Sequence, residues 1–214
     1  MAGASAMGQD VGDARLAPVR AVTFFRRSLP TRLEGEGTRI RALRAEDAQA
    51  LLELRLRNRA FLTPWDPDRP AAFFTLAGQR AVLAEHRDAW RDGRRFAFAI
   101  CAGDDVPLGS VTLDNVVRGA MQGATLGYWL DEASGGRGHA TEAVRLTLRF
   151  AFDHVGLHRV QAAVMPRNPR SARVLAKAGF RHEGRALRYL RIAGAWEDHD
   201  LFAVTAEERE GRGA

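Results

Sequence analysis

The chain has 214 residues, 46% hydrophobic and 27% charged, which is the composition of an ordinary globular domain. Its single cysteine, Cys101, excludes a disulfide framework and a cysteine-rich metal site. No apolar run reaches the ~18 residues of a membrane span. The net charge is +6, and Lys177 is the only lysine among 32 basic residues. This arginine excess fits either a compositional bias or attraction to a polyanion, and charge alone does not distinguish them.

The chain order predicts one domain with short extensions. Residues 1–34 begin Gly- and Ala-rich without a hydrophobic period, so we expect a flexible extension there. The domain is expected over 35–208 and a tail over 209–214. The Arg26-Arg27 pair is not followed by the apolar segment of an export signal, so we expect a cytoplasmic protein.

The first half of the domain is predicted to contain helices followed by an antiparallel meander. Alternating polar and apolar residues predict a strand over 38–43, and Asp47 is a typical N-cap for the helix that follows. Three prolines between Pro64 and Pro70 predict a loop, because proline does not fit a helix interior. Beyond this loop we expect a helix over 72–91 and strands over 96–101, 108–113 and 124–130.

The second half alternates helical and strand patterns. They predict a helix over 138–154, a strand over 159–165, a helix over 169–178, and closing strands over 180–191 and 196–205. Such an order is typical of a mixed sheet with helices on its faces.

The main chemical signal is the glycine-rich turn between strand 124–130 and helix 138–154. The turn brings glycine backbone, unpaired N–H groups, the positive end of the helix dipole and Arg137 to one point. It therefore suits a phosphate or pyrophosphate. The alternative is a turn whose glycines only redirect the chain. It is neither a P-loop nor a dinucleotide fingerprint, which would need a glycine where Thr141 stands.

The second signal opens the helix over 169–178. Asn168 followed by Pro169 is a good N-cap pair, and this local role is the alternative to contact with a ligand. Arg173 and Lys177 lie one turn apart on one face, where they could meet a second phosphate. For Lys177, the alternative is a cation that stabilises the helix C-terminus.

Together these motifs resemble the GNAT acetyltransferase superfamily, and within it the RimJ/RimL branch that acetylates protein N-termini. Residues 136–143, Gly-Arg-Gly-His-Ala-Thr-Glu-Ala, are similar to its pyrophosphate loop and helix start, and Asn168-x-x-Ser171-x-Arg173 to its next helix. Further similar segments are residues 62–67, 115–119, 126–128, 158–159 and 194–199. One departure is Gly135, since the loop often opens with Gln or Arg.

The resemblance implies an α/β fold of three layers, α-β-α, with a mixed, mostly antiparallel sheet splayed at two central parallel strands. It implies that acetyl-CoA binds in that splay without a metal ion. The implied cofactor-binding residues are Trp129, Leu130, Arg137, Gly138, His139, Ala140, Thr141, Asn168 and Arg173. Ser171 is implied to protonate the leaving thiolate, and backbone N–H groups from Tyr128 onward to polarise the thioester carbonyl.

The implied reaction is acetyl transfer to the α-amine of a protein N-terminus, with a ribosomal protein that begins with Ala or Ser as the expected acceptor. An α-amine of pKa ~8 is ~10% neutral at pH 7, whereas a lysine is far below 1%, so a water-linked carboxylate is a sufficient base. Asp114 and Glu132 are candidates for that carboxylate. The alternatives are acetylation of a small amine such as an antibiotic or polyamine, and an arginine-rich ribosome- or RNA-associated module. Direct nucleic-acid binding is not expected, because basic and aromatic residues are not interleaved.

Overall fold

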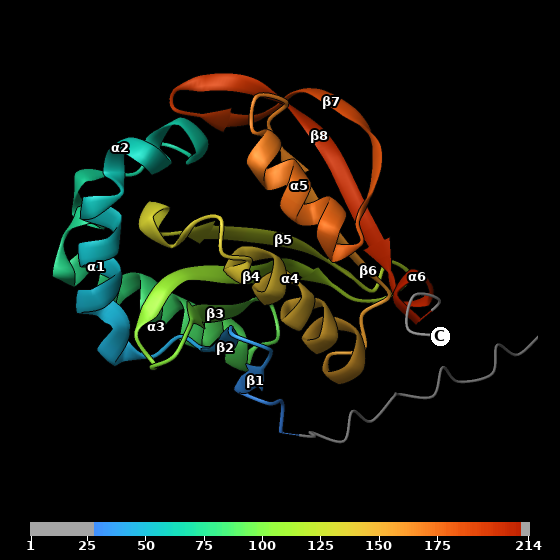
Figure 1. The fold of residues 1–214 in the computed structure, drawn as a ribbon, viewed down its shortest axis with the longest axis horizontal. Helices are drawn as coiled ribbons and strands as arrows, with labels where there is room; N and C mark the ends of the chain where they lie inside the picture. Colours follow the sequence, from blue (N-terminus) through green and yellow to red (C-terminus); the bar gives the residue numbers. More distant parts are fainter. Residues whose placement is uncertain (1–27, 211–214) are drawn as a thin grey trace, which may run out of the picture.

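The computed structural model describes residues 28–210, so residues 1–27 and 211–214 of the predicted extension and tail lie outside the described residues. Its strands form one mixed sheet in the order β1-β2-β3-β4-β5-β6-β8-β7 (Figure 1). The strands are β1 Arg32–Glu34, β2 Arg39–Ala42, β3 Phe96–Cys101, β4 Pro107–Val117, β5 Gly123–Leu130, β6 Arg159–Val164, β7 Arg181–Ile192 and β8 Ala195–Thr205. The α-helices are α1 Ala48–Arg57, α2 Arg59–Leu62, α3 Leu76–Arg91, α4 His139–Arg149, α5 Pro169–Ala178 and α6 Ala206–Glu210.

The pairing of β5 with β6 is the one parallel pairing in this sheet, and all other neighbouring strands run antiparallel. β5 and β6 are bridged by α4, as a parallel pair requires a crossover. Their register covers only three residue pairs, from Gly123 with Arg159 to Thr125 with Gln161. Beyond Thr125 the two strands separate, which confirms the predicted mixed sheet splayed at its parallel pair.

Helices cover both faces of the sheet. α4 and α5 lie together in front of the central strands in Figure 1, and α1 and α3 form a second group at the left. The main core lies between the sheet and α4–α5, with Val144, Leu175 and Phe98 fully buried. A smaller cluster packs α1 and α3 through Leu51 and Leu83. Each such side chain contributes about 1.5–3 kcal/mol of burial free energy, so both layers hold the splayed strands in place.

Asp47 stands at the N-cap position of α1, as predicted, but its side chain makes no capping hydrogen bond to that helix. Its carboxylate accepts hydrogen bonds from both terminal nitrogens of Arg41, at 2.8 and 2.7 Å, and from the backbone N–H of Arg44 at 2.8 Å. Arg41 is only 3% exposed on β2. A buried guanidinium needs a paired carboxylate, and this demand outweighs the local capping preference.

Two helix boundaries also differ from the predictions. The helix expected over 72–91 begins at Leu76, because the Thr75 hydroxyl caps it by accepting from Gly78 N at 3.0 Å, and a 3₁₀ turn over Ala71–Phe74 precedes it. The helix expected over 138–154 ends as a π-helical turn, Phe150–His154.

The boundary of the predicted N-terminal extension lies earlier than expected. β1 falls within residues 28–34 and pairs with β2 from Arg32–Arg41 to Glu34–Arg39. With three residues, β1 is too short for an alternating pattern to be recognised.

Candidate active site

The splay leaves one edge of β5 open. β5 pairs with β4 along its length up to Leu130, but on its β6 side pairing ends at Thr125. The backbone groups of residues 126–130 that face β6 therefore have no strand partner in the described part of the chain. An open edge of this kind binds extended amide-containing ligands as an added strand.

The glycine-rich turn lies at the end of this edge and opens α4. Gly136 and Gly138 have φ values of 76° and 88°, in the left-handed region that favours glycine. Apart from the adjoining residues of the chain, no atom of residues 28–210 lies within 4 Å of the place where a Cβ would stand on either residue, so the turn is open on that side. The first intrahelical bond comes from Glu142 N to Gly138 O at 3.0 Å, so the N–H groups of residues 139–141 are free to bind an anion.

Some side chains around this turn form hydrogen bonds that fix its position, and others are exposed to solvent. His139 Nδ1 lies 2.9 Å from the Thr38 hydroxyl, and the Glu142 carboxylate accepts from the backbone N–H of Glu36. These contacts tie the start of α4 to the β1–β2 turn. Ala140 and Thr141 are half-buried, whereas Arg137 and Arg173 are exposed. Within residues 28–210 Arg137 has no hydrogen bond or ion pair, so its charge is available at the turn.

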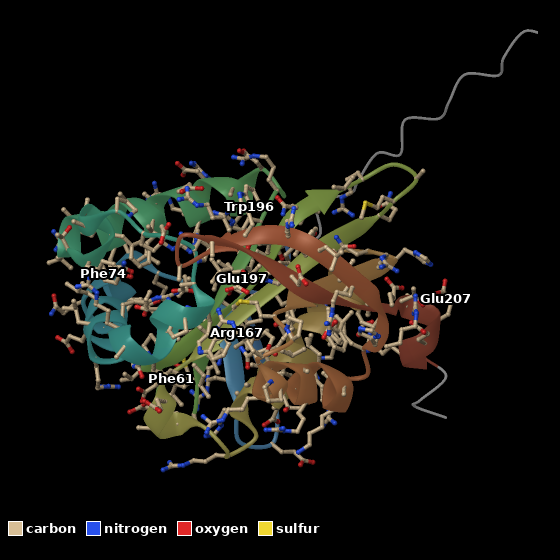
Figure 2. The ribbon with its side chains drawn as sticks, turned by 90° about the horizontal axis from the view of Figure 1, so that it is seen from above. Phe61, Phe74, Arg167, Trp196, Glu197 and Glu207 are labelled. Carbon is tan, nitrogen blue, oxygen red and sulfur yellow. The ribbon has the colours of Figure 1, made fainter. Side chains whose placement is uncertain are left out.

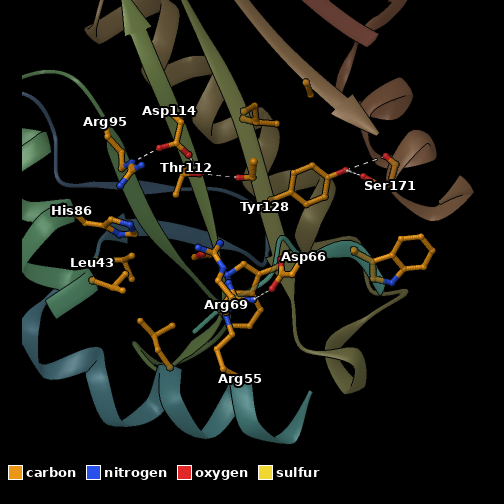
Figure 3. A pocket seen from close by; sticks show the side chains of 18 of the residues that line it. Leu43, Arg55, Asp66, Arg69, His86, Arg95, Thr112, Asp114, Tyr128 and Ser171 are labelled. Carbon is orange, nitrogen blue, oxygen red and sulfur yellow. Dashed lines mark hydrogen bonds and ion pairs between the residues drawn. The ribbon is translucent and has the colours of Figure 1, made fainter. Parts of the chain in front are cut away.

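The predicted residues Ser171 and Tyr128 meet at the head of α5. Asn168 caps this helix by accepting from Ser171 N at 3.1 Å, which is the local role that its position before Pro169 indicated. The Ser171 hydroxyl lies 2.7 Å from the Tyr128 hydroxyl, which also donates to Ser171 O at 3.0 Å (Figure 3). Burial raises the pKa of Tyr128 to about 12, so its hydroxyl remains protonated near neutral pH.

Ser171 and Tyr128 both line a cavity of about 520 Å³ (Figure 3). It is lined by β4, β5, β6 and β8 on one side and by α1, α3 and the segment after α2 on the other. Trp129 lies on its floor, under the Arg55 guanidinium at 3.8 Å from the ring centroid. Arg55 also pairs with Asp66 at 2.7 Å, and burial lowers the Arg55 pKa to about 10. The side chain of Trp129 thus belongs to the cavity. Its backbone faces β4, as do those of Gly127 and Asp131, so the backbone groups on the open edge of β5 are those of Leu126, Tyr128 and Leu130.

Only one of the two carboxylates proposed as a base lines this cavity. Asp114 does, but it is engaged by Arg95 Nε and accepts from the Thr112 hydroxyl at 2.9 Å. Glu132 is exposed on the 3₁₀ turn after β5 and is not among the lining residues. His86 lines the cavity as well, and burial lowers its pKa, so its imidazole is neutral at pH 7.

The β7–β8 hairpin reaches across to the segment after α2. Arg167, in the connection between β6 and α5, donates to Pro64 O at 3.2 Å and pairs with Glu197 on β8 at 3.0 Å (Figure 2). At the hairpin turn, Ala193 N donates to Asp66 O at 3.2 Å. These bonds hold the cavity wall that carries Asp66 in a defined position.

Sequence reasoning missed most of the cavity. Arg55, Asp66, Arg69, His86 and Arg95 come from α1, the loop before α3, α3 itself and the start of β3, and no local motif links them. The one prediction in this region was the Pro64–Pro70 loop. Its prolines indicate an irregular segment but do not show that the segment lines a cavity.

Among residues 28–210, no group of three or more His, Cys, Asp or Glu side chains is arranged to hold a metal ion. None of the helices in that range is long and apolar enough to cross a membrane.

Comparison with known proteins places this architecture. Residues 38–181 match the acetyltransferase (GNAT) domain model. The chain belongs to the GNAT acetyltransferases. This GNAT chain is 41% identical to "Probable N-acetyltransferase YjcK" of Bacillus subtilis over 83% of its own length and 99% of that protein. It is 33% identical to the [ribosomal protein uS5]-alanine N-acetyltransferase of Escherichia coli over 86% of its own length and 96% of that enzyme.

A solved structure of RimJ from Mycobacterium smegmatis, in complex with CoA-disulfide, resembles this GNAT domain with a TM-score of 0.77 and 37% identity, covering 80% of this chain and 83% of that one. The predicted RimJ/RimL resemblance, the fold class and the enzyme class of N-acetyltransferase are thus confirmed.

Proposed function

We propose that this enzyme transfers the acetyl group of acetyl-CoA to the α-amine of a protein N-terminus, and that its acceptor is a ribosomal protein beginning with Ala or Ser. The observation that carries the proposal is the Ser171–Tyr128 pair, which stands where the open edge of β5 meets a polar cavity. The likeness to the uS5-alanine N-acetyltransferase over 96% of that enzyme supports the acceptor class. Ribosomal proteins are made in the cytoplasm, where we propose that the enzyme acts.

The residues present fit acetyl-CoA as the co-substrate. The free backbone groups of Tyr128 and Leu130 can pair with the pantetheine amides, which are peptide-like, whereas the backbone of the predicted residue Trp129 faces β4. The amides of residues 137–141 and the Arg137 side chain offer positive potential to the pyrophosphate. Arg173 is exposed on α5 and can meet a further phosphate. Because the Asn168 oxygen is used in the cap, its amide nitrogen is the group left for the pantetheine arm.

The chain's own groups then support a direct transfer. Bound acetyl-CoA supplies the thioester that the acceptor amine attacks. The Ser171 hydroxyl is placed to protonate the departing sulfur, and it stands in the first turn of α5, where the helix potential stabilises an anion. Tyr128 keeps that hydroxyl oriented and, with a pKa near 12, does so as a neutral partner. Backbone N–H groups on the open edge of β5 can polarise the thioester carbonyl.

A peptide α-amine needs less help from a base than a lysine does. About 10% of an α-amine of pKa ~8 is neutral at pH 7, while a lysine of pKa ~10.4 is neutral in well under 1% of molecules. The volume of about 520 Å³ is in the range of ordinary ligand pockets. Guanidinium groups on its wall, Arg55 and Arg69, are donors that match peptide carbonyls.

The test is a panel of acceptors assayed by CoA release and mass spectrometry. It contains short peptides beginning with Ala, Ser, Met or Gly, the same peptides with a blocked N-terminus and an internal lysine, a polyamine and an aminoglycoside. We expect kcat/KM for the Ala and Ser peptides to exceed that for every other acceptor by at least tenfold. A higher value for a small amine would refute the acceptor class and support the small-amine alternative.

A further inference from the structure

His199 is a buried histidine that the proposed function does not yet use. It lies on β8, is 3% exposed and lines the cavity. The last bridge between β6 and β8 joins Val164 to Asp200, so His199 stands at the end of β6, where the chain leaves for the head of α5. It thus faces the acceptor cavity near the strand end that positions Ser171.

The ring of His199 is held in one orientation and one tautomer. Its Nδ1 lies 3.0 Å from Glu197 O, and because a carbonyl oxygen only accepts, Nδ1 carries the proton. The ring also packs edge-on against Tyr189, with the centroids 5.8 Å apart. Glu197 is itself fixed, since its carboxylate pairs with Arg167. The carbonyl that orients His199 therefore belongs to the network that fastens the hairpin across the cavity.

The other ring nitrogen is the available base. Because Nδ1 carries the proton that faces Glu197 O, Nε2 is left as an acceptor, and within the described residues no donor is bonded to it. The rival groups in the cavity are less suited, because Asp114 is engaged by Arg95 and Thr112. His86 has its Nδ1 fully buried without a partner. The charged and titratable groups that share the cavity with His199 are Arg55, Asp66, Arg69, Glu85, His86, Arg95, Asp114 and Tyr128.

We infer that His199 is the general base of the transfer, taking a proton from the acceptor ammonium through water at Nε2. The inference rests on the proposed transfer from acetyl-CoA to an amine, whichever acceptor class is correct. It places the base on the acceptor side of the sheet and the acid, Ser171, at the head of α5.

The step balances as follows. The acceptor ammonium gives one proton to Nε2 and becomes a neutral amine. Its nitrogen forms a bond to the acetyl carbon while the carbon–sulfur bond breaks, and the sulfur leaves with that electron pair. The sulfur takes a proton from Ser171, which recovers one from the acylated nitrogen through water. His199 then releases its proton to solvent, so the products are the amide, the thiol and one proton.

The test compares His199→Asn with the wild type at two pH values. Asparagine keeps a donor for Glu197 O but lacks the basic nitrogen. We expect kcat/KM for the acceptor to fall 30- to 100-fold at pH 7 and less than fivefold at pH 9, where about 90% of an α-amine of pKa ~8 is already neutral. A purely structural role would give the same loss at both pH values, and that result would overturn the inference.

Two controls and a second variant complete the design. His158→Asn makes the same change at a 54% exposed histidine outside the cavity, and we expect no pH-dependent loss from it. His199→Gly, assayed with added imidazole, serves if the asparagine variant melts below the assay temperature. Rescue of at least fivefold, absent in the wild type, supports the base, and no rescue in the folded variant contradicts it.

The failures of the two proposals are distinguishable. A wild-type enzyme that turns over no acceptor in the panel would overturn the proposed function and the inference together. Wild-type turnover with a pH-dependent loss in His86→Asn, but a uniform loss in His199→Asn, would overturn only the assignment of His199.

Discussion

Gly138 offers the sharpest test of the proposal that the glycine-rich turn binds the phosphates of CoA. Its φ of 88° lies in the left-handed region, and no atom stands within 4 Å of a Cβ built on it. Gly138→Ala therefore meets no steric clash and costs only backbone strain, about 1–2 kcal/mol. The strain acts on folding as well as on binding, so we expect CoA affinity to fall no more than about tenfold.

Gly138→Asp adds to this strain a negative charge facing the phosphates. Two unit charges 4 Å apart repel by about 1 kcal/mol in bulk water and about 4 kcal/mol near a protein surface. Relative to Gly138→Ala, these energies correspond to CoA binding that is roughly 5- to 1000-fold weaker. Because the additional loss is electrostatic, it must shrink as the salt concentration is raised, whereas the loss in the alanine variant must not.

Isothermal titration with CoA at 0.1 M and 1 M salt measures both effects, after circular dichroism has shown that the two variants are folded. Equal CoA affinities for the Ala and Asp variants at low salt would refute the assignment of the turn to a phosphate. A difference that does not respond to salt would show that Asp acts through shape rather than charge.

Three further predictions concern the Ser171–Tyr128 pair and the fold. Ser171→Ala should lower kcat about 100-fold, as loss of a general acid does, while KM for acetyl-CoA changes less than threefold. A thiol-release assay measures both constants. An equal loss in binding and in turnover would show that Ser171 has only a structural role. With a pKa of about 12 in the folded state and ~10 when unfolded, Tyr128 contributes about 2–3 kcal/mol of stability that is present below pH ~10 and is lost as the pH rises to 12. Tyrosinate absorbance of the two tyrosines should therefore show a step near pH 12 that Tyr128→Phe removes. Asp47→Asn should lower the free energy of unfolding, measured by urea denaturation, by about 3–5 kcal/mol, because it leaves Arg41 buried without its ion pair. As a control, Glu53→Gln at an exposed carboxylate should change the free energy of unfolding by less than about 0.5 kcal/mol.

Predictions that depend on residues close together in the chain agree well with the structure. α5 was expected over 169–178 and has those bounds, because Asn168 and Gly179 supply its cap and its left-handed end. The glycine turn before α4 adopts the positive φ angles that only glycine accepts easily. Asp47 shows the limit of such reasoning. It is a typical capping residue, but its carboxylate binds the buried guanidinium of Arg41, six residues earlier, instead of capping the helix.

The amino-acid sequence by itself determined most helices and strands, the glycine-rich turn and the family resemblance, since each rests on short motifs of neighbouring residues. Only the tertiary structure decided the site. Tyr128 on β5 reaches Ser171 in the first turn of α5 across 43 residues, because the chain returns through α4 and β6 before α5 begins. One cavity contains Arg55, Asp66, Asp114 and His199. They meet there because β4, β5, β6 and β8 are successive strands of the sheet and α1 and α3 pack together beside them. Such contacts depend on the register and stacking of layers, which no local spacing in a chain encodes.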